Sequence, residues 1–102
     1  MANWEYHINL KEIWEEYDED KIDVETAGKK VAKVLKSLKA NAEIDSYLLD
    51  ELDEVIYLFE HNCEGEEEFN FAMRELYDWG DTDMPTPPGK MRRKLAWIAT
   101  RF

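Results

Sequence analysis

The sequence contains one cysteine, Cys63, so no disulfide can form within the chain. It also has no run of about 18 uncharged apolar residues, the length that a membrane-spanning helix needs. Its first residues have neither the basic stretch nor the apolar stretch of a secretory signal peptide. These absences argue against a disulfide-linked scaffold and a transmembrane helix, and they predict a cytoplasmic protein with a free structural thiol.

Basic residues are scarce, with 13 Lys and Arg against 24 Asp and Glu and a net charge of −11. Residues 1–23 hold eight acids and two lysines, residues 24–39 one acid and five lysines, residues 40–83 fifteen acids and one arginine, and residues 84–102 five bases and no acid. A surface this negative repels nucleic acid and anionic membranes and attracts basic proteins. We therefore expect a basic protein partner, and no direct binding of nucleic acid or membrane. The alternative is that the charge serves solubility alone.

Proline and glycine are also few, and all three prolines lie within residues 81–89, which we predict to be a loop. Hydrophobic residues make up 44% of the chain and include four Trp, five Tyr and four Phe. This composition is too apolar for a disordered chain, and 102 residues are enough for one core. The sequence predicts a single domain over residues 1–102.

The spacing of hydrophobic residues changes along the N-terminal segment. Trp4, Tyr6 and Ile8 alternate with polar residues, which predicts a half-buried strand over residues 3–8. Helical spacing follows, with Asn9 placed to cap the helix and with Ile8 and Ile13 placed to form a hydrophobic staple. The sequence therefore predicts a helix that begins at residue 10 and fades in the acidic residues 18–20. Its predicted buried face is Leu10, Ile13, Trp14 and Tyr17.

Three further stretches have helical periodicity: residues 24–39, 44–61 and 66–79. Asp23 is placed to cap the first of them, and Gly28 inside it predicts the close approach of a neighbouring element. The apolar arc of the second covers roughly half the circumference, more than the stripe of about 100° on a surface helix. We predict that this helix, over about residues 43–62, is contacted on two sides and forms the centre of the fold. Its apolar arc includes Tyr47. The predicted inward face of residues 66–79 is Phe69, Ala72, Met73, Leu76 and Tyr77. The short connection between the last two stretches predicts that they pack antiparallel.

Residues 94–102 alternate again and predict a second strand. Neither terminal strand would be stable alone, so we predict that the two pair as a ribbon against the helices. The predicted fold class is therefore α+β, with about four helices around the central helix and a two-stranded ribbon formed by the N- and C-terminal segments. We also expect substantial burial of Trp4, Trp14, Phe59 and Trp97.

Patterns typical of catalysis, metal binding and cofactor binding are missing. Catalytic carboxylates need burial to change their pKa values, and nearly all of the carboxylates here fall on predicted solvent-facing arcs. The two histidines do not stand in a metal-ligand pattern, and Cys63 has no second thiol with which to bind zinc. We therefore predict a protein that is not an enzyme and that has no metal and no cofactor. The alternative is an enzyme that uses carboxylates near Asp81 and Asp83, which requires a deep pocket with a buried acid.

The best candidate for a functional surface is acidic, because carboxylates spaced along a rigid helix can occupy a basic groove in place of phosphates. The predicted partner-binding residues are Asp50, Asp53, Glu54, Tyr57 and Glu60 on the central helix, joined by Glu15, Glu16, Asp18, Glu19 and Asp20 on the first helix. The lysine face of residues 24–39 is expected to be solvated and to offset the acids on either side. A second candidate surface is the basic segment of residues 90–94, which alternatively protects a strand edge by its charge.

Four runs carry a resemblance to known proteins: WEYHINLKEIW at residues 4–14, KIDVETAGKKVAKVL at residues 21–35, FAMRELYDWGDT at residues 71–82 and KLAWIATRF at residues 94–102. They resemble a family of small acidic, uncharacterised proteins of bacteria and their mobile elements, which implies no activity. In size and acidity the chain is also similar to phage inhibitors of host defence, such as anti-CRISPR and anti-restriction proteins. We therefore expect a non-enzymatic inhibitor that engages a basic surface of a nucleic-acid-binding host enzyme. A self-associating structural or regulatory protein that uses the terminal ribbon and the proline-rich loop is the alternative, and either a monomer or a homodimer is compatible with the sequence.

Overall fold

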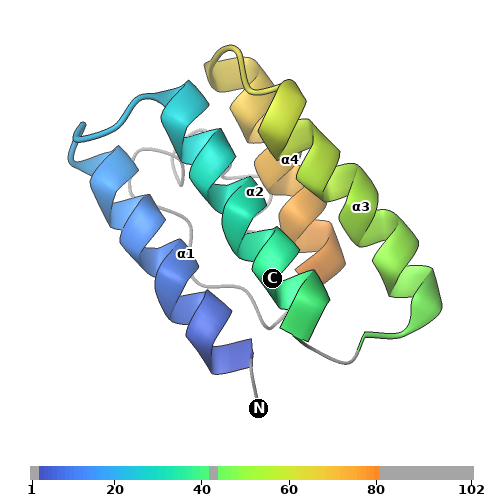
Figure 1. Ribbon diagram of the computed structural model, residues 1–102. Helices are drawn as coiled ribbons and strands as arrows, with labels where there is room; N and C mark the ends of the chain where they lie inside the picture. Colours follow the sequence, from blue (N-terminus) through green and yellow to red (C-terminus); the bar gives the residue numbers. More distant parts are fainter. Residues whose placement is uncertain (1–2, 42–43, 81–102) are drawn as a thin grey trace.

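The computed structural model describes residues 3–41 and 44–80, with side chains described for residues 8–40 and 44–80. The described chain forms four helices: α1 (Asn3–Asp18), α2 (Val24–Asn41), α3 (Ser46–His61) and α4 (Glu66–Gly80). The helices run alternately up and down, so each is antiparallel to the one before it (Figure 1). The predicted antiparallel packing of the last two helices is confirmed.

The predicted α+β fold is wrong for residues 3–41 and 44–80, which contain helices and no strand. Residues 3–8, predicted as a strand, are the first part of α1. The predicted cap and staple are wrong as well, because Asn9 and Ile8 lie inside α1 and Ile8 is 45% exposed. A lone strand leaves its backbone groups unpaired, whereas each residue added to a helix adds a hydrogen bond. The other half of the predicted ribbon, residues 94–102, lies outside the described residues, as do the predicted loop and the basic segment of residues 90–94.

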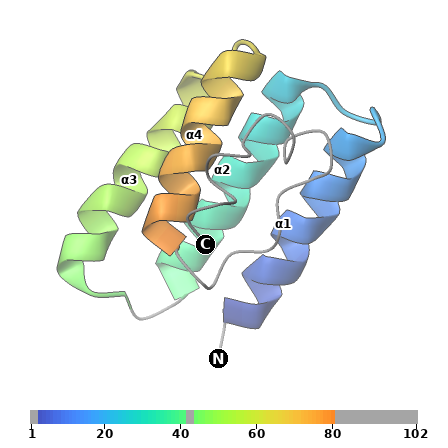
Figure 2. The same ribbon diagram turned by 180° about the vertical axis from the view of Figure 1, so that it is seen from behind.

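Helix α2, and not α3, holds the central position. It lies between α1 and α3 in Figure 1 and between α1 and α4 in Figure 2, and it packs against all three. The residues that α2 buries include the small side chains Ala27, Val31 and Ala32, which let neighbouring helices come close from several directions. The predicted central helix over residues 43–62 is therefore wrong in position. Its predicted contact on two sides is confirmed, because α3 packs against both α2 and α4.

Aromatic side chains join the helices in the interior. The ring centroid of Phe69 on α4 lies 5.1 Å from that of Tyr17 on α1 and 5.8 Å from that of Phe59 on α3, the latter pair in an edge-to-face arrangement. The burial expected of Trp14 and Phe59 is confirmed, while Trp4 and Trp97 lie outside the described side chains. The predicted inward faces of α1 and α4 are confirmed at every position, with burial of Leu10, Ile13, Trp14, Tyr17, Phe69, Ala72, Met73, Leu76 and Tyr77.

Gly28 marks a close approach between α2 and the C-terminal end of α3. A Cβ atom at this position would lie 2.8 Å from the Phe59 carbonyl oxygen and 2.8 Å from Cβ of Cys63. Neither atom is the free end of a flexible side chain, so neither can move away without a shift of backbone. The predicted close approach at Gly28 is confirmed, and it explains why a residue of poor helix propensity lies within α2.

We predict that Gly28→Ala lowers the free energy of unfolding. Alanine gains up to about 1 kcal/mol in helix propensity, but overpacking a buried contact usually costs about 1–3 kcal/mol. Denaturant unfolding followed by circular dichroism measures the difference. Gly65→Ala is the control, because its Cβ would meet only the carboxylate end of the flexible Glu68 side chain. A Gly28→Ala variant as stable as the parent would contradict the close approach.

Asp23 caps the first turn of α2, as predicted. The backbone N–H of Thr26 donates a hydrogen bond to Asp23 Oδ1 at 2.8 Å. This hydrogen bond is the main cause that lowers the pKa of Asp23 from its ordinary value of 3.8. Because the folded-state pKa is the lower one, the cap stabilises the fold above the ordinary pKa, and this contribution is lost as the pH falls through the folded-state value.

We predict that Asp23→Ala lowers the melting temperature at neutral pH and that Asp23→Asn lowers it less, since Asn also caps helices. Thermal unfolding of the three proteins across a pH series provides the measurement. Asn does not ionise, so the advantage of the parent over Asp23→Asn should shrink as the pH falls through the titration of the aspartate. A constant difference at every pH would show that the charge of the cap contributes nothing.

Candidate functional site

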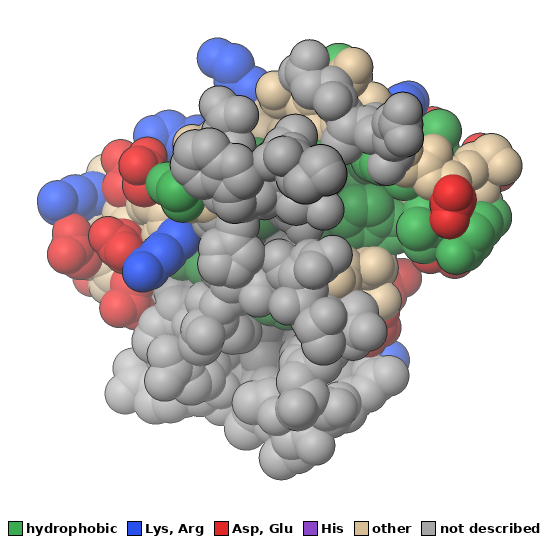
Figure 3. Space-filling model, turned by 90° about the horizontal axis from the view of Figure 1, so that it is seen from below, with side chains coloured by type: hydrophobic (Ala, Val, Ile, Leu, Met, Phe, Trp, Pro, Cys, Tyr) green, Lys and Arg blue, Asp and Glu red, His purple; other side chains and the backbone are tan. Residues whose placement is uncertain are grey.

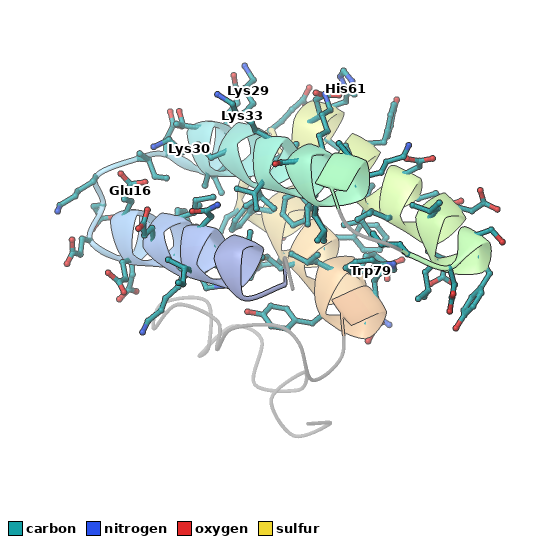
Figure 4. All side chains as sticks on the ribbon, turned by 60° about the horizontal axis from the view of Figure 1, so that its bottom comes forward. Glu16, Lys29, Lys30, Lys33, His61 and Trp79 are labelled. Carbon is teal, nitrogen blue, oxygen red and sulfur yellow. The ribbon has the colours of Figure 1, made fainter. Side chains whose placement is uncertain are left out.

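The lysines of α2 point in two directions. Lys29 and Lys33 extend away from the helix layer into solvent, and Lys29 pairs within its own helix with Glu25 at 3.3 Å (Figure 4). Lys30 lies on the flank that faces α1, where its Nζ is 3.1 Å from Glu16 Oε1. The predicted solvated lysine face is confirmed, because all of these lysines are exposed, and Lys30 on the flank also offsets a neighbouring acid, as predicted.

The opposite flank of α2 binds α3 through two further ion pairs. Lys36 pairs with Glu60, and Lys39 pairs with Asp53. The hydrogen bond from Lys36 is the main cause that holds the pKa of Glu60 below its ordinary value, and Nε2 of His61 lies 3.1 Å from the other carboxylate oxygen. Two of the predicted partner-binding residues on α3, Asp53 and Glu60, are thus already engaged within the molecule.

The other three predicted residues of α3 face outward. Asp50 and Glu54 are exposed and have no ion-pair partner among residues 8–40 and 44–80, and Tyr57 is 62% exposed. Tyr47, which the apolar arc predicted to be buried, is 66% exposed and lies on the same side of the helix. We call Tyr47, Asp50, Glu54 and Tyr57 the α3 outer face. The Tyr57 ring packs against the His61 ring with centroids 5.0 Å apart, which restricts the rotation of the tyrosine.

The acids of α1 form a separate surface. Glu15, Glu16, Asp18, Glu19 and Asp20 cluster at the C-terminal end of α1, on the far side of α2 from α3 (Figure 1). Glu16 pairs with Lys30, and Glu19 pairs with Lys21 at 3.0 Å. In the view from below, acidic and basic side chains are interspersed at the edge on the α1 side, whereas hydrophobic side chains gather at the edge on the α3 side (Figure 3). The structure does not join the two predicted acidic sets, because α2 separates them.

A groove between α3 and α4 was not predicted from the sequence. It has a volume of about 380 Å³, a rim of four carboxylates and an apolar floor. The indole Nε1–H of Trp79 donates a hydrogen bond to the Leu48 carbonyl oxygen at 2.9 Å, which fixes the ring in the floor. Glu51 and Glu54 on α3, and Glu75 and Asp78 on α4, are each three residues apart, so each pair lies on one face of its helix. The predicted antiparallel packing was a signal that the two faces could meet, although it does not give the register of the helices. The lining residues are Glu51, Glu54, Val55, Leu58, Glu75, Asp78 and Trp79.

A second groove, of about 620 Å³, lies beside the close contact of α2 and α3 and is lined by side chains of both charges, among them Glu25, Lys29 and Glu60. Its cysteine, Cys63, is buried, and the thiol donates a hydrogen bond to the Leu58 carbonyl oxygen at 3.5 Å. Burial, with a smaller effect of the Glu68 charge, raises the pKa of Cys63 to about 12. The thiol is therefore protonated at neutral pH, and the groove offers no thiolate nucleophile. Within the described ranges no group of three or more His, Cys, Asp or Glu side chains could hold a metal ion.

We predict that Cys63 reacts with a thiol reagent at pH 8 about a thousandfold more slowly in the folded protein than in urea. The reason is that a pKa of about 12 instead of 9.0 lowers the thiolate fraction by that factor. Absorbance after addition of a disulfide reagent gives both rates, and no second cysteine interferes. Glu68→Gln should accelerate the folded-state reaction slightly, since it removes the smaller cause. Equal rates in the two states would mean that the thiol is exposed and that burial does not raise its pKa.

No helix in the part of the chain described here combines the length and apolar character required to cross a bilayer. Comparisons of the chain with protein-family models, curated proteins and solved structures gave no match. The resemblance to small acidic bacterial proteins therefore stays a prediction.

Proposed function

We propose that this protein is a non-enzymatic binding module of the cytoplasm whose α3 outer face engages a basic surface of a partner protein. We further propose that the partner is a nucleic-acid-binding host enzyme and that binding inhibits it. The observation that carries the proposal is the composition of this face: two carboxylates without an ion-pair partner in the described structure, flanked by two largely exposed tyrosines.

The two residue types serve binding in different ways. Tyrosine supplies a large, rigid contact area at a low cost in side-chain entropy and is enriched among the residues that dominate interface energies. The carboxylates of Asp50 and Glu54, one helical turn apart, attract lysine and arginine side chains and increase the rate of encounter with a basic surface. Since α3 packs against both α2 and α4, these groups are presented on a rigid element.

The burial pattern supports binding rather than catalysis. In residues 8–40 and 44–80, no Asp, Glu, His, Lys or Arg side chain is buried. The carboxylates of both grooves lie at the surface, without the burial that adjusts a catalytic acid or base. Two negative groups on an exposed helix fit better with a surface that substitutes for phosphates in a basic groove.

We predict that the double charge reversal Asp50→Lys and Glu54→Lys weakens binding of the partner by about tenfold or more, with a smaller dependence of affinity on salt. The partner is identified by affinity capture from the native host cell and mass spectrometry, and its affinity is then measured by calorimetry at two salt concentrations. Asp53 and Glu60 are left unchanged, because lysines there would face Lys39 and Lys36 across the α2–α3 contact.

The matched control is Glu12→Lys with Glu64→Lys, which changes the net charge equally at exposed positions outside both predicted acidic sets. The control should weaken binding only through the long-range charge, and hence far less at physiological salt. If both double variants lose the same affinity, the net charge rather than the α3 outer face accounts for binding. If neither loses affinity, the proposed function is wrong.

A further inference from the structure

The groove between α3 and α4 differs from the rest of the acidic surface because charge surrounds an apolar floor. Each helix contributes two carboxylates to the rim, and no basic side chain is among the lining residues in the described ranges, 3–41 and 44–80. Val55, Leu58 and the indole of Trp79 form the floor, and the hydrogen bond from Trp79 to Leu48 keeps the indole in place without a ligand. The groove is therefore a preformed site in which one part is apolar and the other part is negative.

These features favour one kind of occupant. A metal ion does not fit, because the rim carboxylates do not form a group of three ligands close enough to hold one. A neutral apolar ligand would lie among negative groups and would gain nothing from them. A cation on an apolar stem satisfies both parts, since methylene groups cover the floor while the charged end meets the rim.

Between the two cationic side chains, arginine fits the groove better than lysine. The guanidinium group is planar, is weakly hydrated, stacks on an indole ring and has five N–H donors for carboxylates on two sides. Lysine is a strongly hydrated point charge that loses more solvation on entering such a site. The volume of about 380 Å³ is at the lower end for small-molecule pockets and suits one long side chain rather than a helix.

We propose that the α3–α4 groove binds one arginine side chain of the basic partner protein, with its methylene stem on Val55 and Leu58 and its guanidinium group against the Trp79 ring and the rim carboxylates. The inference rests on the proposed function, because it assigns the partner a residue and a place. Glu54 belongs both to the rim and to the α3 outer face, so an arginine in the groove brings the partner surface onto the two exposed tyrosines.

The probe is N-acetyl-arginine methylamide, titrated into the isotope-labelled protein while the indole N–H resonances are followed by NMR. Trp79→Phe, checked for folding by circular dichroism, assigns the Trp79 resonance by its absence. We expect a saturable shift of this resonance with a dissociation constant on the order of 1 mM, as for a ligand of this size. N-acetyl-lysine methylamide should bind several-fold more weakly. N-acetyl-citrulline methylamide, which has the same shape without the charge, should give no saturable shift.

Glu51→Gln with Glu75→Gln should weaken arginine binding by about tenfold, the equivalent of one charge-assisted hydrogen bond. The control is Glu12→Gln with Glu15→Gln, which removes the same charge on α1 and should change binding less than twofold. An unsaturable shift, an equal shift with the citrulline probe, or equal losses of affinity in the two double variants would overturn the inference.

The affinity for the captured partner separates the two proposals. If the Asp50 and Glu54 charge reversal weakens binding of the partner and the Glu51 and Glu75 variant does not, the function stands and the groove assignment fails.

Discussion

The position of α2 between its neighbours is the constraint on which the rest of the structure depends. The buried stripe of α2 contains small residues, so α1, α3 and α4 can all pack closely against it. At Gly28 the absence of a Cβ atom allows the C-terminal end of α3 to approach. A larger side chain at Gly28 would move the Phe59 backbone, and with it the ring that meets Phe69 in the interior. A change at Gly28 would therefore affect both the separation of α2 and α3 and the packing of α4.

The same position decides which acids of the protein face a partner. Lysines on the two flanks of α2 pair with Glu16 on one side and with Asp53 and Glu60 on the other. These side chains are substantially exposed, so the pairs contribute little to stability. Their effect is on the distribution of charge. The acidic arc of α3 divides into a neutralised strip beside α2, the α3 outer face, and the rim of the groove beside α4.

The local features of the fold could be predicted from the sequence, because periodicity, caps and glycine positions act over a few residues. The helices near residues 24–39, 44–61 and 66–79, the buried face of α4, the Asp23 cap and the contact at Gly28 all follow from such signals. The strand over residues 3–8 was wrong because an alternation this short fits the first part of a helix equally well. The division of the acids was not predictable, since the carboxylates of α3 look alike in the sequence until the lysines of α2 are placed beside some of them. The groove was missed for a related reason: it needs the register of α3 against α4, which periodicity alone does not give.

The α3 outer face and the groove would respond differently to salt, and this difference bears on how one small helix could recognise a partner. Attraction between exposed carboxylates and a basic surface acts over about 10 Å at moderate ionic strength and is screened as salt increases, so it favours encounter without fixing orientation. A side chain held against a fixed indole is screened less, because part of its binding comes from apolar contact at a water-poor floor. Glu54 belongs to both surfaces. A partner drawn to the outer face by charge would thus reach the groove within one helical turn, where geometry rather than net charge decides whether it stays.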